Sequence, residues 1–289
     1  MPNPYFIIFE LMIYLLLAVC IRNASRQGLA HLLRLLAGVL YGITLELATI
    51  HQLGAYEYGR FLLMIGSVPL CVGAAWGCII YSVMEFSDAS SLPYWVRPVL
   101  DGLLALNIDL ALDAVAIRLG FWSWGQGLRF QYFGVPYANF WAWFLVVFSF
   151  SLGYRLLAHR EDWMVTWVSP LLAVVIGLIA VLGTNVFVSN DPLVDYKYFL
   201  VVTLSFALIL IISMRPRFYQ TPVPLLAFWI PFILHSYILA AGLVSGVILE
   251  PSFLLVVGVS MTLLSVSLHR SALPGILIKK VTVTLHSSE

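Results

Sequence analysis

The stretch from Asp109 to Trp143 reads DLALDAVAIRLGFWSWGQGLRFQYFGVPYANFWAW and places two acids in an apolar setting. Asp109 and Asp113 lie four residues apart, and a loop dense in Trp, Phe, Tyr and Gly follows them. Asn139 then begins the next apolar run. Apolar runs joined by an aromatic loop are typical of helices that cross a membrane and meet at its interface. The two acids are therefore expected inside hydrocarbon, where a charged group needs a partner or a purpose.

The whole chain has the composition of a membrane protein. Of its 289 residues, 62% are hydrophobic and only 10% are charged, and the mean hydropathy is +0.98. A soluble domain has about a quarter of its residues charged. The net charge of +1 gives no reason to expect a nucleic-acid partner, and the three cysteines form neither a disulfide framework nor a metal-ligand spacing. We therefore expect an all-α, polytopic integral membrane protein with no metal or cofactor.

Nine apolar runs are long enough to cross about 30 Å of hydrocarbon. We place them at 4–21, 32–53, 61–84, 98–118, 138–156, 164–187, 197–213, 222–247 and 252–268. The first run has no basic residue before it and no small-residue cleavage site after it, which favours an uncleaved span over a signal peptide. We expect one transmembrane domain over 1–268 and a polar cytoplasmic tail over 269–289. Oligomeric state is left open.

The distribution of Lys and Arg predicts the orientation. With the N-terminus outside, the outer segments contain only Arg60, Arg118, Arg129 and Lys197 of the 15 basic residues. The others fall in inner segments, which is the asymmetry that the positive-inside rule expects. We therefore predict an outer N-terminus and a cytoplasmic C-terminus, in the cytoplasmic membrane of a prokaryote.

Within the spans, we single out four ionisable residues: Glu46, Asp109, Asp113 and His235. In the predicted orientation Glu46 lies about 10 Å below the outer boundary, and Asp113 and Asp109 lie about 8 Å and 13 Å below it. Asn139 and Asn185 fall toward the same side. A shared depth favours one polar site built by four spans. His235 is more typical of a buried core histidine.

Asp109 and Asp113 stack on one helix face because they are separated by four residues. Two ionised carboxylates repel each other in a low dielectric, so we expect the pair to share a proton. One member can then donate a proton while the other accepts one. The alternative is structural, in which each acid pairs with a donor such as Arg118, Asn139 or Tyr56.

The aromatic loop supports two interpretations. Trp and Tyr collect at membrane interfaces whatever a protein does, so the loop alone indicates a belt. Four glycines and Pro136 instead indicate a folded loop that packs back on the protein. Aromatic faces also stabilise cations. Above an acid pair, such a loop suits carbocation chemistry.

The motifs resemble a family of membrane carotenoid-biosynthesis proteins that includes the carotenoid 1,2-hydratases and bisanhydrobacterioruberin hydratase. The resemblance lies in an acid-bearing helix, a Trp-x-Trp pair at Trp122 and Trp124, and YFGVP-x-x-NF-x-x-W from Tyr132 to Trp143. The Glu46 helix, the GAYEYG turn and VPLCVGAAWGCIIY are also similar, so the resemblance covers about residues 40–160. The chain departs from the family pattern at Ala142 and at QLG before the turn.

The resemblance implies hydration of the terminal isopropylidene double bond of an acyclic carotenoid or related isoprenoid. Asp113 or Asp109 would donate the proton, and the other acid or Glu46 would orient and deprotonate water. Trp122, Trp124, Tyr132 and Trp143 would shield the cation, Asn139 would position the water or an acid, and Tyr56 would contact the substrate. The implied partners are a lipid-soluble polyene or prenyl chain and membrane lipid.

Three other functions stay open. An isoprenoid cyclase could use the same acid and exclude water. A prenyltransferase could use the two DxxxD pairs, Asp109–Asp113 and Asp191–Asp195, to bind Mg²⁺ on a diphosphate. A proton-coupled transporter could use the acids as a relay, although the sequence contains no clear repeat.

Overall fold

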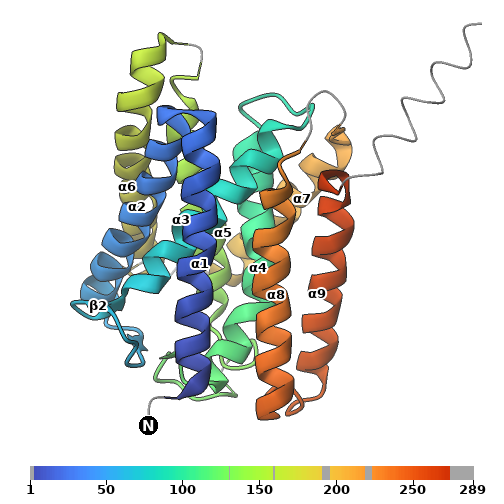
Figure 1. Ribbon diagram of the computed structural model, residues 1–289. Coiled ribbons are helices and arrows are strands. Elements are labelled where there is room, and N and C mark those ends of the chain that lie inside the picture. Colours follow the sequence, from blue (N-terminus) through green and yellow to red (C-terminus); the bar gives the residue numbers. More distant parts are fainter. Residues whose placement is uncertain (1–2, 130, 159, 191–195, 219–222, 274–289) are drawn as a thin grey trace, which may run out of the picture.

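The computed structural model describes residues 3–129, 131–158, 160–190, 196–218 and 223–273, and their regular structure is almost entirely helical (Figure 1). The helices of these residues are α1 (Pro4–Gln27), α2 (Leu29–Leu53), α3 (Leu70–Asp88), α4 (Arg97–Arg118), α5 (Tyr137–Arg155), α6 (Ser169–Asn190), α7 (Tyr196–Met214), α8 (Leu225–Ser245) and α9 (Phe253–His269). Each predicted span corresponds to one of them. The predicted all-α class is confirmed. Most of the predicted tail, and the Asp191–Asp195 pair, lie outside the described residues.

Short elements join the helices. The strands are β1 (Glu57–Tyr58), β2 (Met64–Ile65), β3 (Val68–Pro69) and β4 (Trp122–Ser123), a π-helical turn (Met164–Val168) precedes α6, and a 3₁₀ turn (Arg270–Ala272) follows α9. The span predicted at 61–84 begins too early, because β2 and β3 pair as a hairpin around Gly66, whose φ is 60°. Helix α3 then begins after Pro69. The apolar residues before it therefore belong to a loop.

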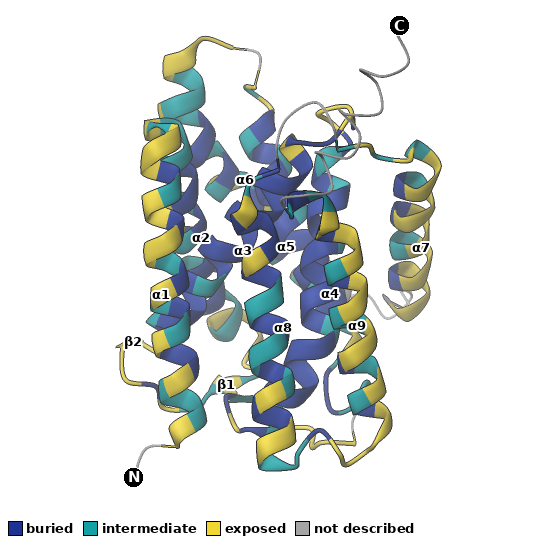
Figure 2. Ribbon diagram, turned by 45° about the vertical axis from the view of Figure 1, so that its right-hand side comes forward, coloured by how far each residue is buried: buried dark blue, intermediate teal, exposed yellow. Residues whose placement is uncertain are grey.

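Seven of the described helices are long and apolar enough to cross a membrane, and α4 and α5 are the two that are not. Helix α4 carries acids and arginines along its length, which lowers its hydropathy. It packs against α3, α5, α8 and α9, and Figure 2 shows buried α4 and α5 ribbons in the middle of the view, with exposed residues on α1 at the left and on α7 and α9 at the right. The chain is thus an all-α polytopic membrane bundle with a polar helix at its centre. Nine crossings and the outer N-terminus stay predictions.

Close packing of α2 on α3 depends on glycines in both helices. Gly38 and Gly42 lie one turn apart on α2, and Gly73 and Gly77 lie one turn apart on α3. A Cβ at Gly38 would lie 3.2 Å from the Cα of Gly77. Small residues at this spacing let two membrane helices approach closely, because van der Waals packing drives helix association in lipid. The contact fixes α3 against the helix that carries Glu46.

Ion pairs join the bundle at the end away from the N-terminus. Arg34 of α2 bonds to Glu85 and, at 3.0 Å, to Asp88 of α3. Arg155 of α5 bonds to Asp88 at 2.8 Å and to Asp101 of α4 at 3.0 Å. The polar pattern of the spans does not predict this cluster, since its members lie near span ends, where a charge can also face water. It connects four helices and leaves the opposite end for the site.

We predict that Gly77→Val destabilises the bundle by about 1–3 kcal/mol through overpacking. Even a Cβ at this position would lie 2.4 Å from Cγ2 of Val39 and 3.0 Å from its backbone nitrogen. The matched control is Gly183→Val, because a Cβ at Gly183 meets nothing within 4 Å. Thermal unfolding in detergent should show a lower midpoint for the first variant only. Equal midpoints would contradict the α2–α3 packing.

Candidate active site

Two loops cover the end of the bundle that carries the N-terminus. The loop after α2 contains β1 and the loop after α4 contains β4, and these strands pair antiparallel with Tyr58 opposite Trp122. Four glycines of the second loop, Gly120, Gly125, Gly127 and Gly134, have φ between 69° and 92°. These angles favour glycine over residues with a Cβ. The prediction that this loop folds back on the protein is therefore confirmed.

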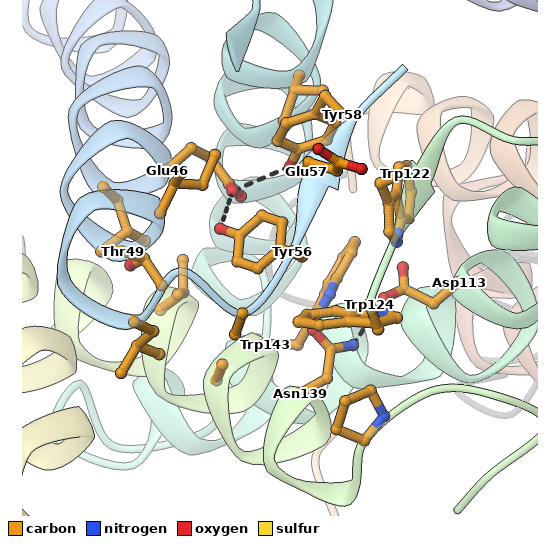
Figure 3. Close-up of a pocket in the computed structure, with 18 of the residues that line it drawn as sticks. Glu46, Thr49, Tyr56, Glu57, Tyr58, Asp113, Trp122, Trp124, Asn139 and Trp143 are labelled. Atoms are coloured by element: carbon orange, nitrogen blue, oxygen red, sulfur yellow. Dashed lines mark hydrogen bonds between the residues drawn. The ribbon is translucent and has the colours of Figure 1, made fainter. Parts of the chain in front are cut away.

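A cavity of about 780 Å³ lies beneath the paired loops. Its wall comes from α1, α2, α3, α4, α5, α6, α8 and both loops, and Figure 3 shows the side chains that meet there. Most residues of the predicted site line this cavity: Glu46, Tyr56, Asp113, Trp122, Trp124, Asn139 and Trp143. Asn185 lines it as well. Asp109 and Tyr132 are not part of the lining. Most of the predicted residues thus share one cavity, as their shared depth indicates.

Asn139 joins the two acids of α4. Its side-chain nitrogen donates to Oδ1 of Asp109 at 3.0 Å and to Oδ2 of Asp113 at 2.7 Å. Asn139 lies in the first turn of α5, which begins after Pro136, and so its amide faces the last two turns of α4. Asp109 is completely buried and Asp113 is 2% exposed. One amide therefore supplies a hydrogen bond to each carboxyl group.

The other oxygens of the pair, Oδ2 of Asp109 and Oδ1 of Asp113, have no hydrogen-bond partner among the described residues. A buried, unpartnered anionic oxygen is costly, and two adjacent anions also repel each other. A single proton on the pair reduces both costs. This geometry suits the shared proton that we expect from the sequence.

Glu46 has a different environment. Oε2 accepts from the hydroxyls of Tyr56 and Tyr58, and Oε1 accepts from Nε1 of Trp76 at 2.9 Å. Burial raises the pKa of both phenols above the usual tyrosine value, and the charge of Glu46 raises it further, so both hydroxyls remain donors. These donors occupy three of the roughly four acceptor positions of a carboxylate. Glu46 is therefore surrounded by groups that suit an anion.

Aromatic rings surround the acids. Trp124 packs on Tyr56 with centroids 4.8 Å apart, and Trp122 packs edge-on against Tyr58 at 5.8 Å. In Figure 3 the ring of Tyr56 lies between Glu46 and Trp124. Tyr132 instead donates its hydroxyl to the carbonyl of Leu110 at 3.0 Å. This bond holds the loop against the acid-bearing helix, outside the cavity.

Two residues of the site, Tyr58 and Trp76, are absent from the sequence-based set. Both donate a hydrogen bond to the carboxylate of Glu46. They lie in the GAYEYG and VPLCVGAAWGCIIY stretches, whose family-like pattern was a usable signal. Nothing in the spacing shows that Trp76 faces Glu46, because this depends on how α3 crosses α2.

Other polar residues of the spans make separate contacts. Arg118 donates to the carbonyl oxygens of Ala114 and Phe133 rather than to an acid. His235 of α8 bonds to Asn107 of α4 at 3.2 Å in the core. Within the described ranges, no group of three or more His, Cys, Asp or Glu side chains is placed to hold a metal ion. The cavity is lined by carboxylates, amides, hydroxyls and aromatic rings.

We predict that a disulfide forms across the paired loops in the variant Glu57→Cys/Ser123→Cys. These residues are directly opposite in the β1–β4 pair, where Cα atoms lie about 4.5–5.5 Å apart, within the range of a disulfide. The native cysteines are buried and free. After mild oxidation, the double variant should lose reactivity toward a maleimide while each single variant keeps it. Full reactivity of the double variant would mean that the loops do not pair.

Comparisons with known proteins extend the resemblance. The model of the carotenoid biosynthesis protein family matches residues 3–212, from α1 into α7. No curated protein and no solved structure matches the chain. All cavity-lining residues except Leu234 fall in the matched region. Since the match covers more than half of the sequence, the chain is an integral membrane protein that belongs to the carotenoid biosynthesis protein family.

Proposed function

We propose that the protein is an intramembrane hydratase that adds water to the terminal isopropylidene double bond of an acyclic carotenoid or related isoprenoid. The observation that carries this proposal is the Asp109–Asn139–Asp113 arrangement, because it presents one acid of a proton-sharing pair to an aromatic-lined cavity. Family membership supports a place in carotenoid biosynthesis. Burial of the cavity in a membrane bundle suits a lipid-soluble substrate.

Asp113 is the proton donor in this proposal, because it lines the cavity and Asp109 does not. Asp109 lies one turn earlier on α4 and is completely buried. It is the second member of the pair, and its negative charge remains when Asp113 carries the proton. Asn139 holds the two carboxyl groups in position, because its amide donates one hydrogen bond to each.

The reaction proceeds in two steps. Asp113 gives its proton to the less substituted carbon of the double bond, and the π electrons form the new C–H bond. The cation is left on the tertiary carbon. Water then forms a C–O bond to that carbon, and the proton it releases returns to the Asp109–Asp113 pair. The product is a tertiary alcohol, and the electron count requires no oxidant or reductant.

Side chains around the acids would stabilise the cation and admit water. Trp122, Trp124 and Trp143 line the cavity, and aromatic faces stabilise a nearby cation. Tyr56 lies between Glu46 and Trp124 (Figure 3). We assign Tyr132 a supporting place behind α4, since its hydroxyl is bonded to Leu110. Polar residues of the lining, including Glu57, Ser123 and Gln126, offer a route for water.

We predict that expression in a lycopene-producing host yields pigments that have gained one or two molecules of water. Asp113→Asn should reduce this product about 10²–10⁴-fold, the usual contribution of a general acid. The control is Asp162→Asn, an exposed acid before α6, which should keep normal activity. Mass spectrometry of the extracted pigments measures both.

Two results would contradict the hydratase. A new pigment of unchanged mass would identify a cyclase that uses the same acid. Full activity of Asp113→Asn would remove Asp113 as the donor, provided that the variant protein is present at the same level.

A further inference from the structure

Trp76 is held in a slot on α2 that is formed by Gly42 and Glu46. A Cβ at Gly42 would lie only 2.5 Å from Cβ of Trp76 and 2.9 Å from its Cγ, so the indole occupies the space that a side chain would take. One turn later on α2, Glu46 accepts from the indole nitrogen at 2.9 Å. Gly42 and Glu46 lie on the same face of α2 because they are four positions apart. The slot therefore fixes the position and orientation of the Trp76 ring.

The ring of Trp76 packs against Trp143 of α5. Their centroids are 4.5 Å apart and their planes are inclined by 46°. Both rings line the cavity, although they are only 6% and 9% exposed. Trp143 lies one helical turn after Asn139, the residue that holds the acid pair. The two indoles thus form an aromatic wall next to the proposed proton donor.

This wall has the electrostatics of a cation site. The face of an indole attracts a positive charge, and the attraction is stronger when water is excluded. The Glu46 carboxylate accepts from the N–H edge of Trp76, so its negative charge lies beside the ring and adds to the attraction for a cation in the cavity. No Lys or Arg of the described residues makes an ion pair with Glu46. The cavity therefore contains a buried acid without a permanent counter-ion.

The contacts of Glu46 also bear on its role. Tyr56, Tyr58 and Trp76 all donate to this carboxylate. A general base would need to accept a further proton from water at an already crowded group. A fixed counter-charge needs no such change.

We propose that Trp76 and Trp143, with Glu46 hydrogen-bonded to the N–H edge of Trp76, form a binding site for a tertiary isoprenoid carbocation, and that Glu46 acts through Trp76 instead of as a base. The site rests on the proposed function, which it deepens by naming the species stabilised. Its expected ligand class is a cationic isoprenoid. A stable probe of that class is a geranyl chain that ends in a trimethylammonium group.

The first test measures binding and needs no turnover. The probe is compared with its neutral isostere, a geranyl chain that ends in a tert-butyl group, by titration calorimetry on the full-length protein in detergent. We expect the wild type to bind the ammonium compound about tenfold more tightly. Trp76→Leu should remove most of this preference, although Asp109, Asp113 and Glu46 are still present. Trp76→Phe keeps a ring and should retain part of it.

The control is Trp141→Leu, because Trp141 lies on α5 two residues before Trp143, packs on Phe199 and is not part of the cavity lining. It should keep the full preference. An unchanged preference in Trp76→Leu, or no preference in the wild type, would overturn the site. If the Leu variant does not elute as folded protein, Trp76→Phe decides the question, and a preference equal to that of the wild type counts against the site.

The second test separates the two roles of Glu46 with a double-mutant cycle on turnover. If Glu46 acts through Trp76, Glu46→Gln and Trp76→Phe should each lower kcat about tenfold with little change in KM, and the double variant should be no worse than the poorer single variant. Independent, multiplicative losses would show that Glu46 does not act through Trp76 and would overturn this role. If the wild type prefers the ammonium probe but forms no hydrated pigment, the result would contradict the proposed hydratase activity and still support the cation-binding site.

Discussion

The structure depends on how Glu46, Asp109 and Asp113 are kept inside an apolar bundle. An intramembrane charge costs several kcal/mol unless it is paired or bonded, and the protein meets this cost in two ways. Glu46 receives three donors from α3 and the β1 loop, whereas Asp109 and Asp113 share a single amide from α5. The first arrangement suits a stable anion and the second leaves room for a mobile proton. The different chemical roles that we propose for these acids rest on this difference in bonding.

The opposite end of the bundle shows what a purely structural solution looks like. There Arg34 and Arg155 neutralise Glu85, Asp88 and Asp101 across four helices. At the cavity end, no cation of the described residues forms an ion pair with Glu46, Asp109 or Asp113. In the proposed reaction, buried acids without a permanent counter-ion would gain most from a positive charge that arrives during turnover. A proton, or a carbocation made from it, is such a charge.

Local sequence patterns predict the helices and the depth of the site residues along them. They do not predict contacts that depend on how two helices pack. The helices follow from apolar runs, and the shared depth of Glu46, Asp113 and Asn139 follows from residue counts along them. The start of α3 is missed because the β2–β3 hairpin is as apolar as a helix. Trp76 is missed because its contact with Glu46 joins residues 30 positions apart and requires the glycine-mediated approach of α2 and α3. The fold was thus easier to infer than the partners of each acid.

Helices α8 and α9 lie beyond the matched region and pack against α4. Their contacts with it are close: a Cβ at Gly242 would lie 3.2 Å from Val115, and His235 bonds to Asn107. Only Leu234 of these helices reaches the cavity. Asp109 is completely buried, and of the acid pair it is Asp113 that faces the cavity. In the proposed reaction, the packing of α8 and α9 on α4 would leave the Asp113 side as the one from which water arrives, and the residues that would carry the reaction lie within the family-matched part of the chain.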